Sequence, residues 1–123
     1  MSIKVFLVEG LGDGSFKLPD GAVVWGHELP VGAAWYLKHW HVQGLDGKTL
    51  AVRIPGYTWI IDDRCSNCTL PDDIAHRCWV RHGSVEDGTL HVDKNGLTCS
   101  AGAGSIVVPS WHGFLHHGHL VPI

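Results

Sequence analysis

Turn-forming residues divide this chain into short segments, which leaves room for few long helices. Asp46-Gly47, Pro55-Gly56 and Asn95-Gly96 each have the chemistry of a tight turn. The 123 residues include sixteen glycines and six prolines, which add further breaks. β-branched and apolar runs recur between these breaks at spacings of about ten residues, a pattern typical of a small antiparallel barrel or sandwich. We therefore expect one mainly β domain over residues 1–123, with one or two short helices.

The expected strands are short apolar runs bounded by turn residues. Residues 50–54 and 57–61 form the clearest hairpin, around Pro55-Gly56. Residues 30–40 are apolar and aromatic, which fits helical turns or an irregular loop packed on a sheet. Capping signals at residues 69–73 predict a short helix that ends near residue 75. The other predicted strands cover residues 3–8, 21–25, 77–81, 89–93, 97–99, 105–108, 111–115 and 120–121.

The charge balance and the hydropathy of the chain exclude some classes of function. The formal net charge is −3, so the chain lacks the basic balance typical of proteins that bind nucleic acid through phosphate contacts. No run of about 18 apolar residues is present, so a membrane-spanning helix is not expected. The N-terminal segment has no small-residue cleavage site, and we expect a cytoplasmic protein of a bacterium or of a phage-infected cell. Thiols stay reduced in that compartment.

Four cysteines and one histidine crowd into the middle of the chain: Cys65, Cys68, His76, Cys78 and Cys99. Zinc takes four such ligands in a tetrahedron. His76 and Cys78 are two residues apart, so on a strand their side chains would share one face. Cys99 follows a predicted hairpin turn that would return it toward them. The spacing favours a zinc site made by Cys68, His76, Cys78 and Cys99, with Cys65 as a substitute ligand.

Other interpretations of the same residues stay open. Free cysteine is among the most buried residue types, so the thiols would also fit as small core residues, and in an oxidising compartment they would form disulfides. A catalytic site is the rival: Cys78, Cys99 or Ser105 would act as nucleophile with His76 or His112 as base. Three further histidines, at positions 116, 117 and 119, are interpreted as solvent-facing loop residues.

The second half of the chain resembles a family of short uncharacterised proteins from phages and bacteria. The resemblance covers about residues 57–120 and rests on six stretches: Ser66-Asn-Cys-Thr69, His76-Arg-Cys-Trp-Val-Arg-His-Gly83, Val92-Asp-Lys94, Thr98-Cys99, Ala101-Gly-Ala-Gly-Ser-Ile106 and His112-Gly-Phe114. It implies that Cys68, His76, Cys78 and Cys99 belong to the family pattern, whereas Cys65 often does not. It implies no activity, because the family is a domain of unknown function.

These observations predict a zinc-binding accessory protein whose metal is structural and whose partner is a protein or a small molecule. The alternative is a small cysteine- or serine-dependent peptidase or amidase. Four polar residues are left without a role and would fit a ligand pocket: Arg64, Arg81, Lys94 and His112. Asp62 and Asp63, beside Arg64, are interpreted as members of a surface ion pair, which contributes little to stability.

Overall fold

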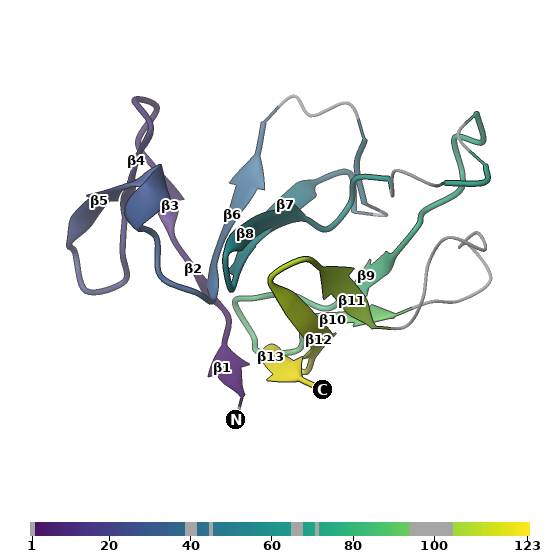
Figure 1. Cartoon of the computed structure of the whole chain (residues 1–123). Helices are drawn as coiled ribbons and strands as arrows, with labels where there is room; N and C mark the ends of the chain where they lie inside the picture. Colours follow the sequence, from purple (N-terminus) through teal and green to yellow (C-terminus); the bar gives the residue numbers. More distant parts are fainter. Residues whose placement is uncertain (1, 39–41, 45, 65–67, 71, 94–104) are drawn as a thin grey trace.

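The computed structural model describes residues 2–38, 42–44, 46–64, 68–70, 72–93 and 105–123. In this part of the chain the protein is mainly β, as the turn pattern predicts. Its strands form four small sheets, and the described strands close no barrel (Figure 1). None of the helical structure in these ranges has the length and apolar character needed to span a membrane.

The central sheet holds the most deeply buried strands of the protein. Its order is β2 (Phe6–Leu7), β6 (Ala33–Leu37), β7 (Thr49–Ile54) and β8 (Tyr57–Ile60). The β2–β6 pair is parallel and the other pairs are antiparallel. The hairpin between β7 and β8 confirms the prediction from Pro55-Gly56, and its closing register pairs the residues on either side of that turn.

Strand β6 differs from the sequence expectation for residues 30–40, which was helical turns or an irregular loop. Ala33 and Ala34 are 0% exposed. Pairing with β2 on one side and β7 on the other satisfies the backbone of the strand. A strand buried in this way carries no alternation of polar and apolar residues, so periodicity does not distinguish it from a helix.

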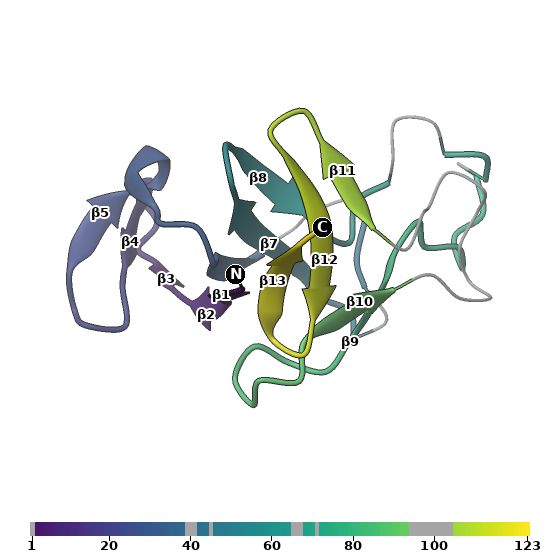
Figure 2. The same ribbon diagram turned by 60° about the horizontal axis from the view of Figure 1, so that its bottom comes forward.

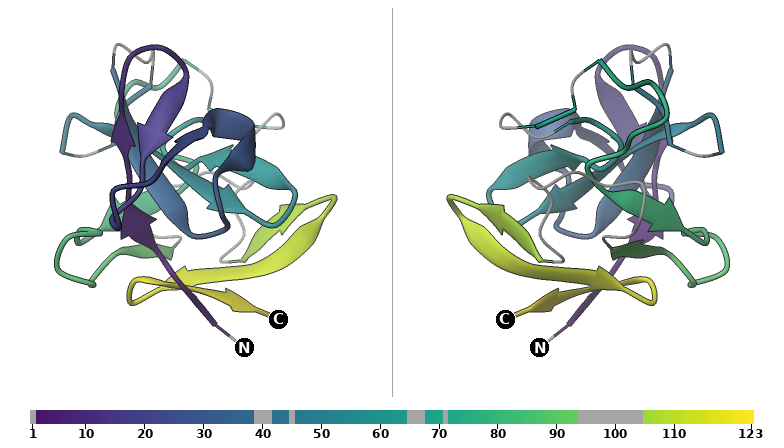
Figure 3. Two further views of the ribbon diagram at one scale, coloured as in Figure 1. Left: turned by 90° about the vertical axis from the view of Figure 1, so that its left-hand side faces the viewer. Right: turned by 90° about the vertical axis from the view of Figure 1, so that its right-hand side faces the viewer.

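A second sheet joins the two ends of the chain. Its order is β1 (Ile3–Lys4), β13 (His119–Pro122), β12 (Trp111–His116) and β11 (Ile106–Val108), all antiparallel. Figure 2 shows the β12–β13 hairpin in front of the strand β10 (His91–Asp93), with which β12 is in contact. Because β1 pairs with β13, both termini lie on the same side of the molecule (Figure 3). The strand predicted over residues 3–8 is broken into β1 and β2, which join different sheets.

The N-terminal region also forms a three-stranded arm at the left of Figure 1. It contains β3 (Glu9–Gly10), β4 (Ser15–Lys17) and β5 (Val23–Trp25), followed by the 3-10 turn η1 (Gly26–Glu28). The arm has a small core of its own, in which Val8, Leu29 and Ala33 are buried.

The remaining pair of strands is β9 (Val80–His82) with β10 (His91–Asp93), antiparallel. Both are shorter than predicted. The helix expected at residues 69–75 is absent from the described residues of that segment, which form turns instead. The Asn95-Gly96 turn and the strand predicted at 97–99 lie outside the described residues. The main core gathers residues from the central sheet, the sheet that joins the two ends of the chain, and β10. Its fully buried side chains include Leu50, Ile54, Ile61, Leu90, Leu115 and Leu120.

Candidate metal centre

Two thiols and one imidazole converge where the chain runs from β8 to β9. His76 Nε2 lies 3.4 Å from the Sγ of Cys68 and 3.5 Å from the Sγ of Cys78. The three donor atoms all lie within 4.8 Å of one another. Cys78 is 2% and His76 3% exposed, and Cys68 is half-buried. The sequence prediction that these three residues share one site is therefore supported by the structure.

The spacing of these donor atoms fits a bound zinc ion. Zinc–sulfur bonds of about 2.3 Å and zinc–nitrogen bonds of about 2.0 Å, at tetrahedral angles, separate a sulfur from a nitrogen by about 3.5 Å. The observed separations of 3.4 and 3.5 Å agree with that value. Thiolate and imidazole are also the donors that zinc prefers. The group can thus hold a metal ion.

The ligands converge by a route that differs from the strand geometry expected for His76 and Cys78. Neither residue belongs to a strand, because β9 begins at residue 80. A backbone hydrogen bond from His76 to the carbonyl of Asp73, 3.3 Å long, tightens the turn before the ligands instead. Arg77 caps this turn, since its Nη1 donates to the carbonyl oxygens of Ile74 and His76 at 2.9 and 2.8 Å.

Arg64 organises the rest of this connection. Its Nη1 donates to the carbonyl of Leu70 at 2.9 Å, and its Nη2 to the carbonyl of Asp73 at 2.7 Å. The same Nη1 lies 3.8 Å from the Sγ of Cys68. Arg64 therefore contacts one of the candidate ligands and holds the loop beside it.

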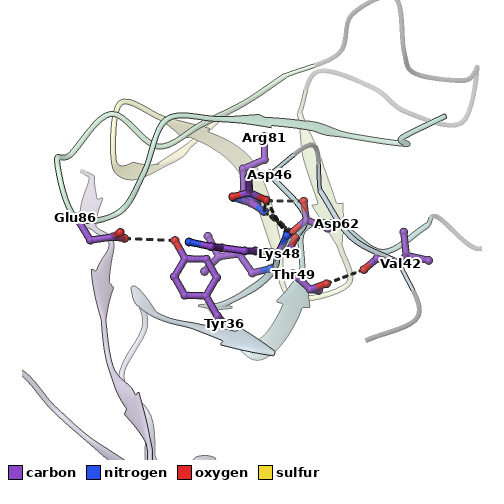
Figure 4. Close-up of polar contacts among 9 residues, drawn as sticks. Tyr36, Val42, Asp46, Lys48, Thr49, Asp62, Arg81 and Glu86 are labelled. Atoms are coloured by element: carbon purple, nitrogen blue, oxygen red, sulfur yellow. Dashed lines mark hydrogen bonds and ion pairs between the residues drawn. The ribbon is translucent and has the colours of Figure 1, made fainter. Parts of the chain in front are cut away.

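A buried ionic network joins the two ends of the connection between β8 and β9. Arg81 Nε donates to both carboxylate oxygens of Asp62 at 3.1 Å, and the two Nη groups donate to Asp46 at 3.0 and 2.9 Å (Figure 4). Asp62 directly follows the buried Ile61, and Arg81 lies on β9, three residues after Cys78. Asp62 also accepts a hydrogen bond from the backbone amide of Leu50 at 2.8 Å. The network therefore ties both ends of the metal-bearing connection to β7.

The two carboxylates of this network have different environments. Burial raises the pKa of Asp62, and the hydrogen bonds from Arg81 act in the opposite direction. At Asp46 partial burial also favours the neutral form, but the hydrogen bonds from Arg81 and from the amide of Lys48 outweigh it and lower the pKa. The interpretation of Asp62 as a surface residue was wrong, because only 1% of its side chain is exposed.

The residues predicted for a ligand pocket are spread over different interactions. The guanidinium of Arg81 is taken up by the buried network, and that of Arg64 by loop carbonyls. The Nε2 of His112 lies 3.0 Å from the Oγ of Ser105, which unites the predicted serine nucleophile with one of its predicted bases. Cys65, Cys99 and Lys94 lie outside the described residues.

The sequence analysis missed the pairing of Asp62 and Asp46 with Arg81. These residues are separated from Arg81 by 19 and 35 positions along the chain, so no local pattern joins them. The nearest signal in the sequence is Arg81 at the end of the apolar run from Cys78 to Val80, since a buried charge requires a partner.

Comparison with known proteins leaves the centre to be interpreted from its own geometry. No protein-family model, no curated protein and no solved structure matches this chain.

Proposed function

We propose that this protein is a small zinc-binding accessory protein in which the metal is structural. The observation that carries the proposal is the convergence of Cys68, His76 and Cys78 at separations that suit zinc. Structural zinc sites are closed, whereas catalytic sites keep a position open to substrate. The near-complete burial of His76 and Cys78 supports the closed, structural kind.

We infer that Cys99 supplies the fourth ligand. Structural zinc is almost always four-coordinate, and three donors are present among the described residues. Cys99 is the proposed fourth on sequence grounds, with Cys65 as the substitute. Replacing each by serine separates the two: loss of the true ligand weakens zinc binding, and loss of the other leaves it unchanged.

The metal would hold in place a connection that has little regular structure. Leu70 and Ile74 lie on it and are 44% and 90% exposed. A rigid loop that presents apolar side chains to solvent suits the binding of a protein partner. In this proposal the zinc ion stabilises the loop, and the loop binds the partner, in the cytoplasm of a bacterium or a phage-infected cell.

Elemental analysis of the purified protein is the first test, and one zinc per chain is the expected result. Because the binding energy of a structural metal is folding energy, a strong chelator should lower the melting temperature sharply. Cys78→Ser and His76→Gln should show the same low melting temperature without chelator. His27→Gln, on the exposed turn η1, is the matched control and should retain wild-type behaviour.

The proposal would be contradicted if the purified protein contained no zinc and its melting temperature were the same with and without the chelator. Alkylation gives an independent measure, since metal-bound thiolates react slowly and an activated catalytic thiol reacts fast. We expect slow labelling of Cys68 and Cys78 in the zinc-loaded protein. Fast, selective labelling of one cysteine in folded protein would favour a cysteine hydrolase instead.

A serine hydrolase is the second candidate function, favoured by the 3.0 Å contact between Ser105 and His112. These residues lie on the outward face of the β11–β12 hairpin, beside the exposed Val107. A serine nucleophile needs its base to be oriented by a third group, and no carboxylate among the described residues contacts His112. A fluorophosphonate probe decides the matter: labelling that disappears in Ser105→Ala would support the hydrolase, and no labelling would exclude an activated serine.

A further inference from the structure

We propose that His82, His91 and Asp93 form a second metal site, which takes a divalent transition-metal ion such as Zn²⁺ or Ni²⁺. All three residues lie on the β9–β10 hairpin, outside the cysteine centre. Two imidazoles and one carboxylate are a donor set that binds such ions while leaving positions open for water or a further ligand.

The strand register places these side chains on one face of the hairpin. His91 is the cross-strand partner of His82 in the antiparallel pair. Directly opposed residues point to the same face, and so do residues two apart on one strand. Asp93 is therefore on the face that carries both histidines. The backbone thus places all three side chains on one face of the hairpin.

One carboxylate faces both imidazoles. Asp93 Oδ1 lies 2.9 Å from the Nε2 of His82, and Oδ2 lies 3.7 Å from the Nε2 of His91. Neighbouring oxygen and nitrogen ligands of one zinc ion, with bonds of about 2.0–2.1 Å, are separated by about 3.3–3.4 Å. The two observed distances lie on either side of this value. The side chains of His82 and Asp93 are 44% and 41% exposed, so an ion in solution can reach them.

The surroundings of His91 hold its ring in place and leave one ring nitrogen for a ligand. The His116 ring stacks on His91 with centroids 4.4 Å apart, which fixes the plane of the ring. The Nδ1 of His91 is buried and has no hydrogen-bond partner among the described residues, which leaves the Nε2 of His91 to bind a ligand.

Calorimetric titration of Zn²⁺ into protein that already carries one equivalent of zinc tests the proposal. The wild type should bind a second equivalent at neutral pH. His82→Gln, His91→Gln and Asp93→Asn should each weaken that step by roughly tenfold or more, because each removes one donor to the ion. His27→Gln, an exposed histidine on η1, should bind as the wild type does.

The results of this titration test the hairpin site separately from the cysteine centre. The absence of a second binding step would overturn the proposal, and so would an equal loss in His27→Gln, which would mark the metal as adventitious. If the half-buried His91 variant fails to fold by circular dichroism, the exposed His82 and Asp93 variants decide the question. A missing first zinc equivalent would count against the cysteine centre and not against this site, since only the step altered in the three hairpin variants belongs to it.

Discussion

The Nε of Arg81 lies 3.1 Å from both carboxylate oxygens of Asp62, and this pair sits in the interior of the protein. The two residues mark the start and the end of the connection that carries Cys68, His76 and Cys78. The metal centre and the buried ion pair therefore hold different parts of the same segment. A bound zinc ion would fix the middle of the segment, and the ion pair fixes its ends.

Asp62→Asn should lower the free energy of unfolding by about 3 kcal/mol, because it removes the buried one of the two carboxylates that pair with the buried guanidinium of Arg81. Asp46 binds the same guanidinium but is 44% exposed. Asp46→Asn should therefore cost below about 1 kcal/mol, as is usual for an exposed ion pair. Urea unfolding of the three proteins measures both values. Equal losses in the two variants would show that burial does not decide the strength of the network.

The pH dependence of stability should carry a contribution from Asp46. Its pKa in the folded protein is lowered from the ordinary value of 3.8. A carboxyl group of this kind stabilises the fold above its unfolded pKa, and the contribution is lost as the pH falls through the folded pKa. The difference in melting temperature between the wild type and Asp46→Asn should therefore be constant above about pH 5 and shrink below about pH 4.

Glu9→Gln provides the control for the Asp46 experiment, since it removes an exposed carboxylate on β3. Its difference from the wild type should be smaller at every pH. An Asp46 difference that grows as the pH falls would reverse the sign of the argument.

Gly44→Ala should destabilise the protein by about 1–3 kcal/mol through overpacking. A Cβ atom at this position would lie 2.6 Å from both Arg81 Nη2 and Asp62 Oδ1. Gly10→Ala is the control, because its new Cβ would meet only the Phe16 ring at 3.6 Å, an ordinary contact. Urea unfolding should show a loss in the first variant alone. Full stability of Gly44→Ala would mean that the network can shift to admit a methyl group.

The parts of the fold that the sequence predicts are those set by local chemistry. Pro55-Gly56 predicts the β7–β8 hairpin because the turn and both strands lie within about a dozen residues. The capping signals at residues 69–73 predict a helix that does not form among the described residues. A helix this short gains little from propensity, and the contacts of Arg64 with the carbonyls of Leu70 and Asp73 favour a different path.

In the candidate site too, the contacts between residues close in the sequence are predicted, and those between distant residues are not. Thiol and imidazole are both ligands of zinc, so the close spacing of Cys68, His76 and Cys78 predicts a shared site. The Asp62–Arg81 pair has no such signal, because Asp62, just after β8, meets Arg81, on β9, only in the folded chain. The same holds for Ser105 and His112, which meet through the register of a hairpin rather than through their spacing.

Arg64→Met should weaken zinc binding by roughly tenfold, in the range seen when groups around metal ligands are removed. The guanidinium of Arg64 contacts the Sγ of Cys68 and orders the loop behind it. Competition with a chromophoric chelator measures the affinity. Arg53→Met is the control, because Arg53 donates to Thr58 within the β7–β8 hairpin, at 2.9 Å. If both variants bind zinc as the wild type does, Arg64 has no role at the metal.

Removal of zinc should open the connection between β8 and β9 before the sheets unfold. Its described residues from Asp62 onward belong to no strand, so few backbone hydrogen bonds hold the segment without the metal. Arg64 and Arg77 lie within it and are sites for trypsin. The rate of cleavage follows the population of the open form, and a ligand that binds only the closed form reduces that population. Chelation should therefore speed cleavage at Arg64 and Arg77 by roughly tenfold or more. Cleavage at Arg53, within β7, should stay slow in both states, and equal rates with and without zinc at Arg77 would show that the metal does not hold this segment closed.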